Sequence, residues 1–242
     1  MTHKTLGLLL AAGEGSRVKE VLTADEPIKP LIKVNGRALI EHSLSYVLGV
    51  TDEVVVLSFP SAEFKPLDDK VSQYEGVKVL KQKAKRRKLP SLLELPYVLL
   101  TQYHFSADRD YLHEFDAILT MPCDLVFDGV DLSELVNFHH EHLQNPNGRQ
   151  ITLLSKSELG GGNSQLFKMD GGRVVGMRRF AGEAVDGYES STQAGVYVFS
   201  RGILRNPLSL LFGFKAVAVY NHLTSGTWID YGNPQNVRAS RG

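Results

Sequence analysis

The sequence predicts an α/β fold in which a mixed, mostly parallel sheet carries helices on both faces. Up to about residue 143, short apolar runs rich in Val, Ile and Leu alternate with amphipathic helical patterns. Apolar strands of this kind are typical of parallel sheets that are buried on both faces. After residue 143 the patterns are mostly strands, and Asp170-Gly171-Gly172 between two of them indicates a hairpin turn.

The first half begins with a buried strand, Leu6–Ala12, followed by a helix over Ala38–Leu48, where apolar residues recur at helical spacing. The further strands and helices expected in this half are Glu53–Phe59, Ala62–Tyr74, Val77–Leu80, Ser91–Phe105, Ala117–Met121 and Leu132–His142. Pro66 lies inside the second helix, where a proline is awkward. Asp131 or Ser133 suits the N-cap of the last helix.

The second half is expected to extend or cover the first sheet. Its predicted strands are Ile151–Leu154, Gln165–Met169, Arg173–Met177, Ala194–Phe199 and Ala216–Tyr220. Its predicted helices are Ile203–Phe212 and a short one opened by Asn233-Pro234. Because no linker composition marks a boundary, we expect residues 1–242 to form a single domain.

Composition narrows the function classes. The 27 Lys and Arg residues balance 27 Asp and Glu residues, so no overall field draws the chain to nucleic acid or to a membrane. An anionic ligand must therefore be held by a local site. A single cysteine precludes an intrachain disulfide, and with no signal-peptide pattern and no membrane-length apolar run we expect a cytoplasmic protein. The oligomeric state stays open.

A glycine-rich turn follows the first strand, a common place for a phosphate in α/β proteins. Gly13 and Gly15 lack a Cβ, so the backbone can approach a ligand closely. Arg17 and Lys29 add positive charge to the same rim. The prolines on either side of Lys29 stiffen its segment, which suits a lysine that meets charge developing in a transition state. The alternative for Lys29 is an exposed loop lysine.

Two aspartates are candidate metal ligands. Ligands of open α/β sheets bind beyond the carboxyl ends of the strands, and Asp124 follows a buried strand at that edge. A carboxylate there is unfavourable unless it binds something. We expect Asp230 at the same edge, where the pair would hold Mg²⁺ beside a triphosphate. The alternative for each is a capping or turn aspartate.

Five segments together resemble the signature of nucleotidyltransferases that make NDP-sugars and related activated alcohols. They are Leu-Ala-Ala-Gly-x-Gly-x-Arg with Lys-Pro-Leu (10–17 and 29–31), 32–41, 124–127, 194–199 and 228–234. They occur in consistent order between about residues 6 and 238. The resemblance implies a Rossmann-like, GT-A-like nucleotidyltransferase fold. It also implies a Mg²⁺-dependent enzyme that transfers NMP from an NTP to a sugar 1-phosphate and releases pyrophosphate.

The resemblance further implies roles for individual residues. The residues implied to bind the nucleotide are Leu10, Ala11, Ala12, Gly13, Gly15, Ser16, Arg17 and Gln82. The implied catalytic residues are Arg17 and Lys29, and the implied Mg²⁺ ligands are Asp124 and Asp230. The residues implied to bind the acceptor are Arg178, Gln193 and Gly195. Residues 1–143 would form the nucleotide-binding half and residues 144–242 the acceptor-binding half.

The chain departs from the pattern where base and acceptor are chosen. The gap between Arg17 and Lys29 is longer than in most sugar members. A basic run, Lys83–Lys88, follows Gln82 in place of the usual small turn. The family's Glu-Lys-Pro segment has no match, and Arg178-Arg179 lies near its place. Base and acceptor therefore stay open, and a cytidylyltransferase acting on phosphocholine or a polyol phosphate, or a non-catalytic nucleotide-binding regulatory module, remain alternatives.

Three further patterns have ordinary structural interpretations. The basic run is read as a solvated loop near the phosphate site rather than a nucleic-acid surface. The helix that carries His139, His140 and His142 is interpreted as a surface helix, because no cysteine or carboxylate set completes a zinc site. Cys123 is read as a packing residue rather than a nucleophile.

Overall fold

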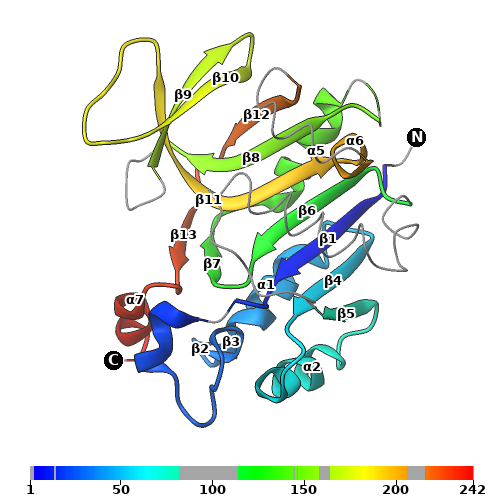
Figure 1. Cartoon of the computed structure of the whole chain (residues 1–242), viewed down its shortest axis with the longest axis vertical. Coiled ribbons are helices and arrows are strands. Elements are labelled where there is room, and N and C mark those ends of the chain that lie inside the picture. Colours follow the sequence, from blue (N-terminus) through cyan, green and yellow to red (C-terminus); the bar gives the residue numbers. More distant parts are fainter. Residues whose placement is uncertain are drawn as a thin grey trace.

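The computed structural model describes residues 3–13, 15–81, 114–143, 145, 147–157, 164–205 and 216–241. The strands of its large sheet are β1 (Thr5–Leu10), β4 (Glu53–Ser58), β5 (Val77–Lys81), β6 (Ala117–Pro122), β8 (Gln150–Lys156), β9 (Ser164–Asp170), β10 (Arg173–Arg179), β11 (Glu189–Ser200) and β12 (Ala218–Leu223). Their order is β5-β4-β1-β6-β11-β8-β12-β10-β9 (Figure 1).

Helices and two small ribbons surround this sheet. The α-helices are α1 (Leu39–Val47), α2 (Lys65–Val71), α5 (Leu132–His142), α6 (Arg201–Arg205) and α7 (Pro234–Ala239). The 3-10 segments are η1 (Ser16–Val21), η2 (Lys29–Leu31) and η3 (Ala62–Phe64). The antiparallel ribbons are β2 (Lys33–Val34) with β3 (Arg37–Ala38), and β7 (Leu125–Asp128) with β13 (Thr227–Asp230). Across the described ranges, every helix is too short or too polar to cross a membrane.

The first half confirms the predicted parallel arrangement. Strand β1 lies between β4 and β6, β5 lies outside β4, and all these pairs are parallel. Leu9 of β1 packs in one buried cluster with residues of α1, α2 and α5. The neighbouring Leu8 belongs to a second buried cluster with Phe115 and Ile203, the latter from α6. Successive strand residues thus face opposite sides of the sheet, and both sides are covered.

The second half corrects the expectation of a mostly parallel sheet. Strand β11 runs antiparallel to both β6 and β8, and β10 runs antiparallel to β9 and β12, whereas β8 and β12 are parallel. Strand β9 also pairs with β11, so five strands close into a small barrel. The tight turn at Gly171-Gly172, with φ of 54° and 81°, returns the chain at once and forces antiparallel pairing.

Local signals placed several boundaries well. Pro66 lies in the first turn of α2, where its missing N–H is not needed. Helix α5 covers the predicted residues, and the Asp131 side chain caps it by accepting from the Ser133 N–H. The predicted helix Ser91–Phe105 lies outside the described residues, and Ile203–Phe212 is described only as far as Arg205.

The last turn of α5 corrects the prediction of a surface histidine cluster. His139 is fully buried, and its Nδ1 lies 2.9 Å from the Thr152 hydroxyl. Within the described part of the chain, no group of three or more His, Cys, Asp or Glu side chains could hold a metal ion. Burial, helped by the neighbouring His140, lowers the pKa of His139 to about 3. Burial and the stacked His3 ring lower the pKa of His140 to about 4.

These histidines should make stability fall in acid. The unfolded chain binds their protons near pH 6.5, whereas the folded chain holds them neutral, so stability decreases as the pH drops below that value. From His139 alone we expect the free energy of unfolding, measured in urea, to be about 2 to 3 kcal/mol lower at pH 4.5 than at pH 7, with a further loss from the less buried His140. His139→Gln, which keeps a polar group beside Thr152, should flatten this dependence. An equal slope in the variant would contradict the assignment.

Candidate active site

The turn after β1 packs directly on the segment that carries Lys29. The Ala11 N–H donates to the Leu57 carbonyl at 3.0 Å, which holds the strand end against β4. Gly15 has a φ of +59°, and a Cβ there would lie 3.2 Å from the Lys29 Cβ. A side chain at residue 15 would therefore be strained and crowded. A Cβ at Gly13 would meet nothing within 4 Å, so that glycine lies beside open space.

Arg17 lies at the start of η1, on its exposed side. This segment is fixed from beneath by the buried Val18 and Val21. It is also tied to α7, where the Arg238 guanidinium lies 2.6 Å from the Glu20 carboxylate. The anchoring brings Arg17 beside the turn that follows β13.

Lys29 forms an ion pair with Asp124. Its Nζ donates to Oδ2 at 2.6 Å, and the two side chains are only 16% and 8% exposed. Burial lowers the pKa of the Lys29 ammonium, but the Asp124 carboxylate and, more weakly, Cys123 and Asp230 outweigh it, so the net shift is upward. Lys29 is thus a charged, partly buried lysine, which rules out the alternative of an exposed loop lysine.

The ribbon of β7 and β13 brings the two aspartates together. Asp230 lies opposite Leu125 in the ribbon, and the Tyr231 N–H donates to the Asp124 carbonyl at 2.8 Å. The Gly232 N–H donates to Asp230 Oδ1 at 2.7 Å. Burial and the nearby Asp124 carboxylate raise the pKa of Asp230, opposed by that N–H and by the two cations. These short strands were not among the elements predicted from sequence.

Gly232 marks the point on which the charged groups converge. A Cβ at this glycine would lie 2.7 Å from Arg17 Nη2, 2.7 Å from Asp230 Oδ1 and 2.8 Å from Asp124 Oδ2. Sequence reasoning did not single it out, although a glycine two positions after a candidate ligand was a usable signal. The absent side chain leaves room among two carboxylates and a guanidinium.

These carboxylates fit Mg²⁺ as partial ligands. Mg²⁺ takes oxygen ligands and is usually held by one or two carboxylates, with phosphate oxygens and water completing its shell. Asp124 and Asp230 supply two such groups at one edge. Since no third His, Cys, Asp or Glu joins them among the residues described, the arrangement suits a metal that arrives with phosphate ligands.

Cys123 is a packing residue, as predicted. It is buried, and burial raises the pKa of its thiol to about 12. A thiol with that pKa is protonated at neutral pH and is a poor nucleophile.

The predicted acceptor residues lie on β10 and β11. Gly195 has a φ of +73° within a register shift of β11, and a Cβ there would lie 3.9 Å from Pro122, two residues before Asp124. Gln193 is buried, and its Nε2 donates to the Met177 sulfur at 3.7 Å. Gly195 thus lies against the end of the strand that leads to Asp124.

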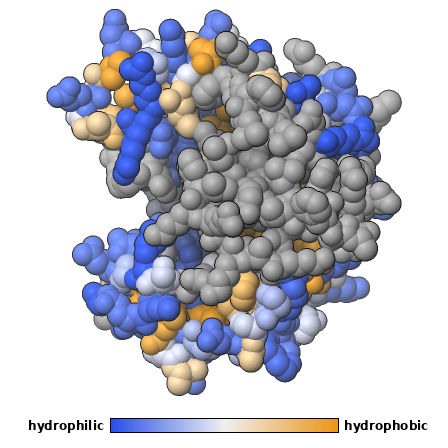
Figure 2. All heavy atoms as spheres, viewed as in Figure 1, coloured by the Kyte–Doolittle hydropathy of each residue, from blue (hydrophilic) through white to orange (hydrophobic). Residues whose placement is uncertain are grey.

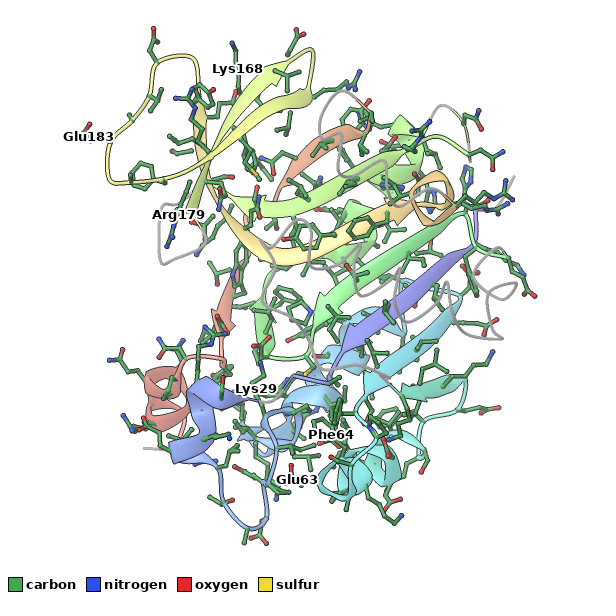
Figure 3. The ribbon with its side chains drawn as sticks, in the orientation of Figure 1. Lys29, Glu63, Phe64, Lys168, Arg179 and Glu183 are labelled. Atoms are coloured by element: carbon green, nitrogen blue, oxygen red, sulfur yellow. The ribbon has the colours of Figure 1, made fainter. Side chains whose placement is uncertain are left out.

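The two arginines at the end of β10 differ in their surroundings. The Arg178 guanidinium lies over the Tyr188 ring, 5.2 Å from its centroid. Figure 2 shows the surface notched between the β9–β10 hairpin and the part that carries η1 and α7. Arg179 is exposed, and Figure 3 shows it at the end of β10 that faces the half of the molecule carrying Lys29. Gln82 and the basic run 83–88 lie outside the described residues.

Comparison with known proteins decides the family. The family model described as the MobA-like NTP transferase domain matches residues 7–158. The chain belongs to this family. The matched range contains the glycine turn, Lys29 and Asp124, and ends before Gln193, Gly195 and Asp230.

Solved structures support the fold of the whole NTP transferase chain. One is described as a "Putative Glucose-1-Phosphate Thymidylyltransferase" from Bacillus anthracis in complex with sucrose, with a TM-score of 0.71 and 14% identity over 98% of this chain and 93% of that one. Another is described as a mannose-1-phosphate geranyltransferase from Thermus thermophilus, with a TM-score of 0.68 and 16% identity over 99% of this chain and 79% of that one. No curated protein matches the chain significantly in sequence. At these identities the likeness shows the fold alone.

Proposed function

We propose that this NTP transferase moves a nucleoside monophosphate from an NTP to a sugar 1-phosphate, with Mg²⁺, and releases pyrophosphate. The observation that carries the proposal is the convergence of two cations and two carboxylates at one edge of the sheet. Lys29 lies 2.6 Å from Asp124, and Arg17, Asp124 and Asp230 all point at the space above Gly232. A triphosphate–metal complex needs both signs of charge at one place.

Each group has a separate task in this reaction. The turn after β1 presents backbone N–H groups and Arg17 to the triphosphate. Asp124 and Asp230 would hold Mg²⁺, which neutralises phosphate charge when bound. Lys29 meets the charge that develops on the α-phosphate. An oxygen of the acceptor phosphate attacks the α-phosphorus in line while the bond to the pyrophosphate oxygen breaks, so positioning and charge stabilisation suffice without a covalent enzyme intermediate.

A sugar 1-phosphate is proposed as acceptor on two grounds. The two solved structures of similar fold cited above are described by names that contain a sugar 1-phosphate. Gly195 has no side chain, so it leaves the backbone beside the end of β6 accessible. An acceptor would have to lie there to reach the nucleotide. An arginine from the end of β10 would supply the positive charge for its phosphate.

Arg179, rather than Arg178, should carry that contact. Both arginines are exposed, but the Arg178 guanidinium lies over the Tyr188 ring, whereas Arg179 faces the half that carries Lys29. We expect Arg179→Ala to raise the KM for the acceptor about tenfold or more with little change in the KM for NTP. Arg178→Ala is the matched control and should change the acceptor KM much less. Equal effects of the two variants on both substrates would contradict the assignment.

A screen of NTPs against acceptors tests the proposal directly. The protein is mixed with Mg²⁺, each NTP and a panel of sugar 1-phosphates, phosphocholine and polyol phosphates, and pyrophosphate release is measured. Release with a sugar 1-phosphate supports the proposal, and release only with phosphocholine or a polyol phosphate moves it to that acceptor class. NTP binding without any turnover would favour a non-catalytic nucleotide-binding module. The absence of both NTP binding and pyrophosphate release would overturn the proposal.

A further inference from the structure

The charged groups of the site lie close to one another, and one cation and one carboxylate among them form an ion pair. Lys29 and Asp124 make a short ion pair, with their side chains mostly shielded from water. A cation placed this close to a carboxylate in a poorly solvated position is held much more strongly than at an exposed surface. The carboxylate oxygen that a metal would need is therefore engaged by an ammonium.

The second carboxylate has a cation beside it as well. Arg17 Nη2 and Asp230 Oδ1 each lie 2.7 Å from the same point, the place of a Cβ on Gly232. Asp124 Oδ2 lies 2.8 Å from that point, so the carboxylates are also neighbours and would repel each other without the two cations. The cluster holds formal charges of +2 and −2 and is balanced as it stands.

We propose that Lys29 and Arg17 act as resident counterions that keep free divalent cations off Asp124 and Asp230 until a triphosphate draws them away. The inference rests on the proposed function, because it assigns the triphosphate to these two cations. A triphosphate offers Lys29 and Arg17 new anionic partners, and the metal that comes with it offers the carboxylates a new cation. Both exchanges leave every charge compensated, whereas a metal alone would leave the ammonium without its partner.

Binding of Mn²⁺ alone, with no nucleotide and no turnover, tests this role. Free Mn²⁺ is measured by electron paramagnetic resonance during titration of the wild type, Lys29→Gln and Arg17→Gln. Lys29→Gln should bind Mn²⁺ about tenfold or more tightly than the wild type, because a charge in contact with the ligand oxygen is removed. Arg17→Gln should show a smaller gain, because Arg17 is exposed. Lys33→Gln removes one exposed positive charge four residues along the chain from Lys29 and should bind Mn²⁺ like the wild type.

Thermal unfolding provides a second readout. A ligand stabilises the folded state by an amount that grows with the logarithm of its concentration over its Kd, so at one Mn²⁺ concentration the midpoint of Lys29→Gln should rise more than that of the wild type. If Lys29→Gln does not fold, Arg17→Gln carries the test, since its side chain lies at the surface. Unchanged or weaker Mn²⁺ binding in the folded variants would overturn the inference. If Mn²⁺ binding is unchanged but the wild type releases pyrophosphate, the proposed function stands and only the counterion role is rejected. If the wild type releases no pyrophosphate in the screen, that result counts against the proposed function and is separate from the Mn²⁺ titration.

Discussion

Lys29→Ala should lower kcat at least about a hundredfold while the KM for NTP changes much less. The ammonium is charged, stiffly held between prolines and directed at the site, so it can stabilise charge that appears only in the transition state. An interaction made mainly in the transition state lowers kcat and kcat/KM together. Pyrophosphate release under saturating NTP and acceptor measures the effect.

Controls separate chemistry from folding in this variant. Removing Lys29 leaves Asp124 buried without its cation, so the unfolding midpoint should fall as well, and turnover must be compared at a temperature where circular dichroism shows a folded chain. Lys33→Ala removes an exposed lysine four residues away and should keep kcat near the wild-type value. A Lys29→Ala protein with near-normal kcat would remove Lys29 from the catalytic residues.

Asp124→Asn should lower kcat about a thousandfold at moderate Mg²⁺, with part of the loss recovered as the Mg²⁺ concentration is raised. Asparagine keeps the shape of the side chain but removes the charge that would hold the metal, and the metal's effect on transition-state charge is worth several kcal/mol. Turnover is measured over a range of Mg²⁺ concentrations, which distinguishes weakened metal binding from a damaged fold.

Asp128→Asn is the matched control for this change. Asp128 is exposed at the end of β7, the strand that begins directly after Asp124, and its substitution should leave both kcat and the Mg²⁺ dependence unchanged. Wild-type Mg²⁺ dependence in Asp124→Asn would argue that Asp124 serves only to position Lys29.

Local chemistry made much of the nucleotide half predictable. The apolar run of β1, the helical spacing of α1 and the capping of α5 are properties of adjacent residues, and each appeared close to its predicted bounds. The glycine turn was readable for the same reason, because a positive φ at residue 15 requires a small residue there.

The second half was harder to predict because its pairing is non-local. The local sequence of β11, Glu189–Ser200, does not indicate that this strand pairs with β6, β8 and β9. The histidines of α5 looked like a polar surface pattern, yet His139 is buried because Thr152, on a neighbouring strand, gives its ring a polar partner.

The residue types of the site follow from the chain alone: a glycine turn, two cations, and two aspartates separated by more than a hundred residues. Their pairing is a property of the folded molecule. Two short strands, β7 and β13, meet as a ribbon and place Asp230 beside Asp124, and η2 packs under the turn so that Lys29 reaches the same carboxylate. Hydrogen bonding between strands joins positions that are remote in sequence, and no local pattern in either strand specifies its partner. Which cation compensates which carboxylate is therefore settled by packing.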